Sequence, residues 1–313
     1  MNTAFPFRIA VIGVGHLGRH HARILSTLEG VELVAVVDIN RERADRVAAS
    51  TGTRSLYDGA DLGAVDAVTL AVPTESHLAV ALPFLERGIP VLVEKPLARS
   101  VAEADAMLAA ASASGATLAV GHTERHNPAV SAARRFLAGP RFIEVHRLGS
   151  FSERSLDVDV VFDLMIHDLD IVLSLVASSV ESIEAVGVPV LTSRIDIANA
   201  RLRFASGCIA NITASRISRD RVRKIRFFQP DAYLSIDYGA QELEVYRLVR
   251  GDGRRPSIEG GKIEIVREEP LKRELEDFLD AARSGRPPLV TGEDGRRAVR
   301  LAQAIAERMA QGS

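Results

Sequence analysis

The chain has 313 residues, 47% of them hydrophobic, and its 39 lysine and arginine residues nearly balance 41 aspartate and glutamate residues. The formal net charge of -2 gives no overall basic field, so composition does not indicate nucleic acid or an anionic membrane as a partner. Cys208 is the only cysteine, which excludes an intrachain disulfide and a cysteine-based metal cluster and fits a reducing compartment.

The length is sufficient for two hydrophobic cores. The sequence shows no signal-type apolar segment near its start and no apolar run of membrane-spanning length, so we expect a cytoplasmic protein. We predict an α/β fold with two domains. Residues 1–122 would form a Rossmann dinucleotide-binding domain, and residues 123–313 an α+β domain for substrate binding and oligomerisation.

The first domain is organised around a glycine-rich turn. The apolar run Ile9–Ile12 predicts a buried parallel strand, and Gly13-Val14-Gly15-His16-Leu17-Gly18 follows it directly. In a G-x-G-x-x-G turn, Gly13 allows the tight turn, Gly15 lets a pyrophosphate approach the backbone, and Gly18 lets the next helix pack on the strand. The turn, with His16 and Leu17 in it, therefore predicts a dinucleotide site.

A second apolar run, Glu32–Val37, ends in Asp38, about 20 residues after Gly18. A carboxylate there accepts hydrogen bonds from the adenosine ribose and repels a 2′-phosphate, which favours NAD over NADP. Arg41 and Arg43 weaken this preference, because either could turn towards a phosphate or could be a solvated residue of the next helix.

The rest of the first domain alternates strands and helices. The pattern predicts strands at Val65–Val72, Pro90–Val93 and Leu118–Gly121, and helices at Arg41–Ser50, Thr74–Arg87 and Ser100–Ser114. Pro73, Thr74 and His77 follow the first of these strands. His77 is either a cofactor-side residue or a surface histidine at a helix start.

Glu94-Lys95-Pro96 follows the next strand. Pro96 keeps Lys95 out of helical geometry, so the lysine is presented at the carboxyl end of a parallel strand, where open α/β sheets bind ligands.

The pattern changes after His122. Alternating or β-branched runs predict a largely antiparallel open sheet in an α+β domain, with strands at Phe142–Leu148, Val180–Val188, Ala198–Phe204, Cys208–Thr213, Lys224–Phe228, Tyr233–Asp237, Glu242–Leu248 and Lys262–Val266. Helices are expected at Leu271–Ser284 and Gly295–Met309. One face of such a sheet needs a cover of helices or another subunit.

One apolar segment of this domain carries Asp163, His167 and Asp170, spaced to share one face of a helix. An aspartate beside a histidine can orient the imidazole and tune its basicity, although a hydrogen-bonded structural histidine has the same pattern. A metal site is not expected here, because hydride transfer needs no metal and further ligands are not evident.

These motifs together resemble the glucose–fructose oxidoreductase / inositol dehydrogenase family (Gfo/Idh/MocA). The matching features are the glycine turn, Pro73-Thr-Glu-Ser-His77, Glu94-Lys95-Pro96 and Asp163-x-x-x-His167-x-x-Asp170. The resemblance implies a dehydrogenase with Lys95, Asp163 and His167 as catalytic residues and substrate between the domains. It also implies a cis peptide at Lys95-Pro96 and a homodimer or homotetramer formed through the open sheet face.

Within the family, three stretches look like the subgroup that oxidises UDP-N-acetylglucosamine at the 3-hydroxyl, whose product a partner aminotransferase converts to an amino sugar for lipid A. They are Asp157–His167, Gly121–Pro128 and Arg223–Tyr233. His122, Arg125 and Asn127 could line the substrate site, although Asn127-Pro128 could equally be a helix start. The basic stretch Arg216–Arg226 would face a diphosphate, or else form a solvated strand edge or a subunit interface.

Alternatives from other classes remain. A free sugar or inositol dehydrogenase would share the catalytic groups, whereas a non-enzymatic NAD-binding sensor would have no use for a proton-transfer pair. Nucleic-acid binding through Arg216–Arg226 is disfavoured by the net charge.

Overall fold

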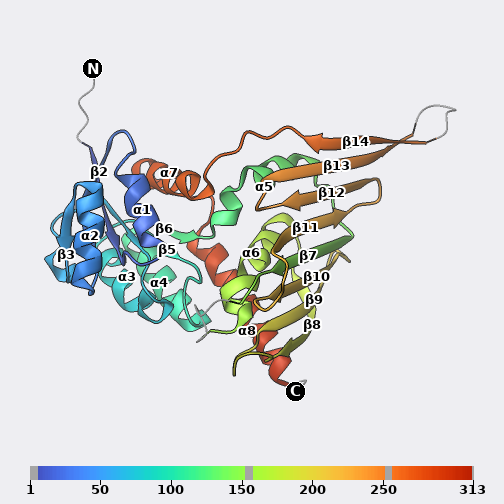
Figure 1. Ribbon diagram of the computed structural model, residues 1–313, viewed down its shortest axis with the longest axis horizontal. Helices are drawn as coiled ribbons and strands as arrows, with labels where there is room; N and C mark the ends of the chain where they lie inside the picture. The colour runs from blue at the N-terminus through green and yellow to red at the C-terminus, as the bar shows by residue number, and fades with distance from the viewer. Residues whose placement is uncertain (1–5, 152–157, 251–255, 312–313) are drawn as a thin grey trace. The chain divides into compact units, whose positions relative to one another are not determined.

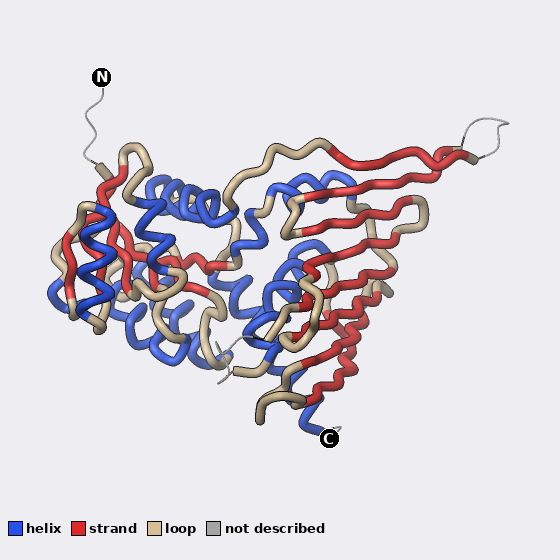
Figure 2. The backbone as a smooth tube through the Cα atoms, viewed as in Figure 1, coloured by secondary structure: helices blue, strands red, loops and turns tan. Residues whose placement is uncertain are grey.

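Two separate sheets make up the computed structural model, which describes residues 6–151, 158–250 and 256–311. One compact unit, the first unit, contains Met1–Thr123 with Leu271–Arg296. The second unit contains Glu124–Pro270 with Arg297–Ser313. Figure 1 labels the elements of each unit, and Figure 2 colours the helices blue and the strands red. The predicted fold class, a parallel Rossmann sheet followed by a mostly antiparallel sheet, is confirmed.

The first unit has a six-stranded, fully parallel sheet in the order β3-β2-β1-β4-β5-β6. Its strands are β1 (Phe7–Ile12), β2 (Val31–Val37), β3 (Arg54–Leu56), β4 (Ala67–Leu70), β5 (Val91–Glu94) and β6 (Leu118–Gly121). The strand order reverses between β1 and β4, so ligands are expected at the carboxyl ends of these strands. All strands except the short edge strand β3 come from the expected apolar runs, because parallel strands are buried on both faces.

Helices of the first unit differ at their ends, because some have a capping side chain and a C-terminal glycine and others have neither. They are α1 (Gly18–Leu25), α2 (Arg41–Thr51), α3 (His77–Leu85), α4 (Val101–Ser114) and α7 (Pro270–Ser284). At the start of α4 the Ser100 side chain accepts the Glu103 N–H, and Gly115 ends that helix at a φ of +75°. The helix expected over Thr74–Arg87 is instead a 3-10 turn, Thr74–Ser76, followed by α3.

Helix α7 packs in the first unit, although it follows the second unit in the chain. Leu275, Phe278 and Leu279 are buried in the same cluster as Ile9 and Val11 of the central strand β1. We expected residues 271–284 in the second domain. The apolar stripe of an amphipathic helix predicts burial but does not say against which sheet.

The second unit is built on an eight-stranded sheet in the order β14-β13-β12-β11-β7-β10-β9-β8. Only β7 and β10 pair in parallel; the other neighbours are antiparallel. The strands are β7 (Phe142–Leu148), β8 (Val180–Val188), β9 (Ile197–Phe204), β10 (Ile209–Ser215), β11 (Val222–Phe228), β12 (Ala232–Asp237), β13 (Glu242–Val249) and β14 (Ser257–Ile263).

The two faces of this sheet differ. Alternate residues such as Ile143 and Val145 are fully buried, on the face covered by helices α5 (Pro128–Ala133), α6 (Ile166–Leu175) and α8 (Gly292–Gln311) (Figure 1). We call the opposite face the open face. It carries an aromatic row whose neighbouring rings lie 5.3 to 6.2 Å apart, formed by Phe142, Phe228, Tyr233 and Tyr246.

The longest helix, α8, has 20 residues and carries charged side chains along its length, including Arg296, Arg297 and Arg300. Within the part of the chain that the structure describes, no helix combines the length and apolar character needed to cross a membrane.

Candidate active site

The glycine turn after β1 has the geometry expected of a dinucleotide site. Gly13 has a φ of +83°, and its N–H donates to Val37 O at 2.7 Å, which ties the turn to β2. A Cβ on Gly18 would lie 1.8 Å from Gly13 O, so only glycine allows α1 to start this close to β1. His16 and Leu17 are exposed beside the half-buried Gly15. This leaves the turn accessible to a ligand.

Asp38 is buried at the end of β2 and closes the same turn. Its Oδ2 accepts the Val14 N–H at 2.9 Å, and its Oδ1 accepts the Asn40 N–H at 2.9 Å. Arg43 Nη1 lies 3.5 Å from Asp38 Oδ2, and the Arg41 guanidinium lies over the Tyr57 ring at 4.5 Å. A carboxylate held here fits a ribose hydroxyl, which agrees with the preference for NAD.

His77 joins the loops that follow β4 and β5. The buried ring has Nδ1 3.0 Å from Pro96 O and Nε2 3.0 Å from Val72 O. Burial lowers the pKa of His77, so the neutral ring donates from one nitrogen at a time. Pro73 and Thr74 lie between these anchored points, in the turn at the carboxyl end of β4. His77 is therefore a buried residue that holds the turn, and the expectation of a surface histidine is wrong.

Lys95 follows β5 and is held through its backbone. The Lys95 N–H donates to Glu94 Oε2 at 3.1 Å, and the Lys95-Pro96 peptide bond is cis, as the family resemblance implied. The other carboxyl oxygen of Glu94, Oε1, lies 3.0 Å from His21 Nε2. Burial opposes ionisation of Glu94, but the hydrogen bond and charge of His21 outweigh it and hold the pKa of Glu94 below its ordinary value. Lys95 is half-buried, next to this fixed carboxylate.

In the second unit, Asp163 lies in a π-helical turn, Val161–Met165, and His167 lies at the start of α6. The π turn is wider than an α-helical turn, so the simple 3.6-residue spacing does not apply at Asp163, and a shared face for Asp163 and His167 stays a prediction. Asp170 forms an ion pair with Arg125, at 3.2 Å between Oδ1 and Nη1, and both side chains are buried. A π turn within a helix is often found at a functional site.

A cavity of about 170 Å³ opens beside Asp163. Four of its lining side chains are cationic. Among the described residues, the lining consists of Arg147, Leu148, Gly149, Ser150, Asp163, Leu164, Arg216, Arg221 and Arg223. Within this lining Asp163 is the one carboxylate among four arginines. Such a lining fits a ligand with an anionic group for the arginines and a neutral group for the carboxylate.

The four arginines of the cavity are not equivalent. Arg147 forms a buried ion pair with Asp168, and Arg216 forms one with Asp196. Arg221 and Arg223 are exposed, and no carboxylate of the described residues lies within ion-pair distance of either. These two are the cations available to a ligand.

The basic stretch Arg216–Arg226 divides between the two faces of β11. Arg223 lines the cavity, whereas the next residue, Lys224, pairs with Asp237 at 3.4 Å. Arg226 pairs with Glu144 at 2.8 Å. Since side chains alternate along a strand, Lys224 and Arg226 lie on the open face. The stretch therefore places some arginines at the cavity and other basic residues in ion pairs on the open face, and a role in diphosphate binding stays a prediction.

His122, Arg125 and Asn127 lie where the strand–helix pattern of the first domain gives way to the strand-rich second domain. The contacts of Asn127 are structural. Asn127 caps α5 through the Ala129 N–H at 3.0 Å, and its amide donates to Tyr238 O at 3.0 Å. His122, Arg125 and Asn127 are buried, and none of them lines the cavity beside Asp163. The helix start predicted at Asn127-Pro128 is confirmed, and a role of these residues in substrate binding stays a prediction.

Sequence reasoning missed Arg147. Its guanidinium contacts Asp168 through Nε at 2.6 Å and Nη2 at 3.1 Å, and it lies over the Tyr238 ring. Asp168 opposes the effect of burial and keeps the pKa of Arg147 above its ordinary value. The available signal was a charged residue in phase with Ile143 and Val145 on an otherwise apolar strand face.

Comparisons with known proteins agree with this geometry. Residues 7–122 match the description "Oxidoreductase family, NAD-binding Rossmann fold", and residues 130–233 match "GFO/IDH/MocA C-terminal domain". The chain belongs to the Gfo/Idh/MocA family. Its first unit therefore carries the NAD-binding domain of this oxidoreductase family, and the predicted family, cofactor and enzyme class are confirmed.

Among family members, UDP-N-acetylglucosamine 3-dehydrogenase from Acidithiobacillus ferrooxidans is 40% identical over 97% of this chain and 96% of its own. A solved structure of that enzyme covers 98% of this chain and 99% of its own, with a TM-score of 0.91 and 37% identity. The scyllo-inositol 2-dehydrogenase (NAD(+)) of Bacillus subtilis is 27% identical, over 92% of this chain and 89% of its own. The full-length similarity is thus greater to the nucleotide-sugar enzyme.

Proposed function

We propose that this protein is an NAD-dependent UDP-N-acetylglucosamine 3-dehydrogenase. The observation that carries the proposal is the cavity in which Arg221 and Arg223 stand near Asp163 without a carboxylate partner among the described residues. A free inositol has no charge for these cations, whereas a nucleotide sugar has a diphosphate. The full-length similarity to the Acidithiobacillus ferrooxidans enzyme supports the same substrate.

The cofactor would be held at the carboxyl edge of the first sheet. The N–H groups of the turn from Gly15 onwards would bind its pyrophosphate, since those of Gly13 and Val14 already donate to Val37 and Asp38, and Asp38 would bind the ribose. The loops after β4 and β5 would complete the site through Pro73, Thr74, His77, Glu94 and Lys95. Bound NAD supplies the hydride acceptor for alcohol oxidation.

The protein's own part of the reaction is proton removal and charge stabilisation. When the sugar hydroxyl is oxidised, its O–H proton passes to the neutral imidazole of His167 as the carbon–hydrogen bond breaks. The Lys95 ammonium stabilises the negative charge that develops on that oxygen, and Asp163 orients the imidazole. Lys95 belongs to the first unit, and Asp163 and His167 belong to the second.

The cavity beside Asp163 would take only part of the substrate. Its volume of about 170 Å³ is below the ~300–1,000 Å³ of ordinary small-molecule sites. Arg221 and Arg223 would bind the diphosphate, with the sugar directed towards Asp163. His122, Arg125 and Asn127 remain proposed substrate-side residues, acting through the buried contacts that position α5 and α6.

The test is an absorbance assay for reduced nicotinamide with NAD and a panel of UDP-sugars, free hexoses and inositols. Reduction with UDP-N-acetylglucosamine, inhibited by UDP, supports the proposal. Reduction with a free polyol that UDP leaves unchanged would keep the dehydrogenase mechanism and reject the nucleotide sugar. NAD binding without turnover of any panel member would favour the sensor alternative.

The open face is the proposed surface for a homodimer or homotetramer. Its aromatic row, led by Phe228 and Tyr233, is only partly buried in the single chain. Light scattering should give a mass of at least two chains, and Tyr233→Asp should shift the mass towards the monomer. A 3-keto sugar product is the substrate class of an aminotransferase, which we propose as the next enzyme in a cytoplasmic pathway.

A further inference from the structure

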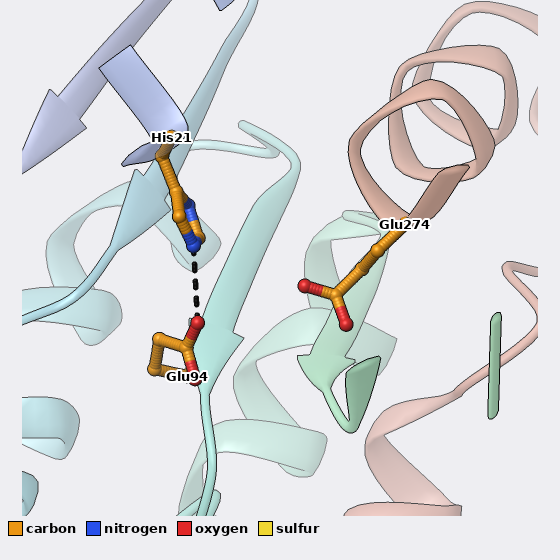
Figure 3. Close-up of side chains that lie close together, drawn as sticks. All are labelled: His21, Glu94 and Glu274. Atoms are coloured by element: carbon orange, nitrogen blue, oxygen red, sulfur yellow. Dashed lines mark hydrogen bonds and ion pairs between the residues drawn. The ribbon is translucent and has the colours of Figure 1, made fainter. Parts of the chain in front are cut away.

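Three buried ionisable side chains meet in the first unit. His21 comes from α1, Glu94 from the end of β5, and Glu274 from α7. Their exposed fractions are 0%, 5% and 2%, and one possible ligand atom from each lies within 4.8 Å of the other two. Figure 3 shows the Glu274 carboxyl directed towards the hydrogen-bonded pair of His21 and Glu94.

The carboxyl group of Glu274 is not satisfied by its surroundings. The Thr123 side chain lies beside it, yet neither carboxyl oxygen makes a hydrogen bond of good geometry within the described residues. His21 Nδ1 is also buried without such a bond in that part of the chain. Native proteins satisfy most buried polar atoms, so an unsatisfied carboxyl next to a second carboxyl calls for a positive partner.

Space beside Glu94 is kept open by a glycine. A Cβ added to Gly121 of β6 would lie 3.0 Å from Glu94 Oε2 and 3.1 Å from its Cδ. A larger residue would therefore press on the carboxylate. Glycine at this position therefore leaves the Glu94 carboxylate undisturbed, and the cluster supplies the donor atoms for a small ion.

We propose that His21, Glu94 and Glu274 bind a divalent transition-metal cation of the zinc class. One imidazole and two carboxylates are a common ligand set for Zn²⁺, and water supplies the remaining position. In tetrahedral coordination, bonds of about 2.0–2.2 Å place ligand atoms about 3.3–3.6 Å apart, so atoms that lie within 4.8 Å of one another need to approach by at most about 1.5 Å. The cation replaces the hydrogen bond between His21 Nε2 and Glu94 Oε1; His21 then binds as the neutral imidazole with its proton on Nδ1, and a proton held by the Glu274 carboxyl goes to solvent.

Such a cation would join three elements that are distant in the chain. It would tie α7 to β5 and α1, in the unit whose core α7 completes. This inference is independent of the proposed reaction, because it assigns no catalytic step to the metal.

The experiment is a Co²⁺ titration of the chelator-treated, tag-free full chain, followed by visible absorption and then by displacement with Zn²⁺. We expect one equivalent to produce the intense bands of low-coordinate Co²⁺. Glu274→Gln should weaken binding about 100-fold or more, since even outer-shell changes cost 10- to 100-fold. Glu276→Gln, two residues further along the same helix and half-exposed, is the matched control and should bind as the wild type does. Zn²⁺ should raise the melting temperature of the wild type but not of Glu274→Gln.

Three outcomes would overturn the proposal. Wild-type protein without Co²⁺ bands would mean that the cluster holds a proton and no metal. Equal affinity in Glu274→Gln and wild type would place the ion elsewhere. Binding lost in His20→Gln but retained in Glu274→Gln would assign the ion to the surface pair His16 and His20, whose ring centroids lie 5.9 Å apart.

Discussion

Arg147 and Asp168 form a two-point ion pair inside the second unit, with Nε to Oδ2 at 2.6 Å and Nη2 to Oδ1 at 3.1 Å. The side chains are 5% and 0% exposed, so neither charge can be solvated if its partner is removed. Arg147 is also one of the residues that line the cavity beside Asp163. The ion pair therefore holds part of the cavity wall in place.

Removing Arg147 should therefore be costly. Arg147→Ala leaves a buried carboxylate and is expected to lower the free energy of unfolding by about 3–5 kcal/mol, measured by urea denaturation. The control is Arg226→Ala, whose ion pair with Glu144 is one-third exposed and should contribute no more than about 1 kcal/mol. Equal losses in the two variants would contradict this account of burial.

The cavity arginines should affect substrate binding more than chemistry. Arg223→Ala should raise KM for UDP-N-acetylglucosamine about tenfold with a smaller change in kcat, because the lost contact is made equally in the ground and transition states. Lys224→Ala changes the next residue, which faces the opposite side of the sheet and pairs with Asp237. Steady-state kinetics should therefore show a larger increase in KM for Arg223→Ala than for Lys224→Ala. If the diphosphate bound on the open face, Lys224→Ala would have the larger increase.

Loss of the proton acceptor should affect turnover. His167→Ala is expected to lower kcat about 10²- to 10⁴-fold while NAD binding, measured by fluorescence, stays near the wild-type value. Lys95→Ala should show a similar loss. Turnover near wild type in a folded variant would reject the catalytic assignment.

Asp196 should make the free energy of unfolding depend on pH in the acidic range. Burial disfavours its charge, but the N–H groups of Val190, Leu191 and Thr192 and the side chains of Thr192 and Arg216 donate to its carboxylate. These donors hold the pKa of Asp196 well below the ordinary value of 3.8. Because the pKa of Asp196 is lower in the folded than in the unfolded chain, its charge stabilises the folded state at pH values above the unfolded-state pKa. This contribution is lost as the pH falls below about 4.

Asp196→Asn should thus be less stable than wild type near neutral pH, and the difference should narrow as the pH falls from 5 towards the acid limit. Urea midpoints measured over that range test it. A difference that stayed constant with pH would show that the carboxylate charge is not the source of stability.

Cys208 should be inert in the folded protein. It is 1% exposed, and burial raises the pKa of its thiol to about 11, so almost no thiolate is present at pH 8. A thiol-specific chromogenic reagent should label the native chain very slowly and one thiol per chain after denaturation, because the sequence has a single cysteine. Rapid native labelling would mean that the strand end opens readily.

The sequence predicted those features that depend on local periodicity. The alternating run Phe142–Leu148 matches β7 residue for residue, and the helix expected over Ser100–Ser114 is α4 with Ser100 as its N-cap. The glycine turn and Asp38 were accessible from a short local motif, whereas the cis Lys95-Pro96 bond was expected only from the family resemblance.

Features that depend on tertiary placement were not accessible. The alternation of side chains along a strand places Arg223 and Lys224 on opposite faces of the sheet. It does not show which of these faces is covered by helices. The π turn at Asp163 breaks the 3.6-residue spacing that the helical argument assumed, and the pairing of Asp170 with Arg125 joins segments 45 residues apart. The meeting of His21, Glu94 and Glu274 spans almost the whole sequence.

The return of α7 to the first unit has a consequence for biosynthesis. A nascent chain that has just emerged through β6 contains every strand of the first sheet but lacks Leu275, Phe278 and Leu279 of its core. The amino-terminal half must therefore remain incomplete on the ribosome until about 150 further residues have been translated, the distance from Gly121 to Leu271. For the same reason, an expression fragment that stops at residue 122 would expose an apolar surface, and the natural unit of folding is the whole chain.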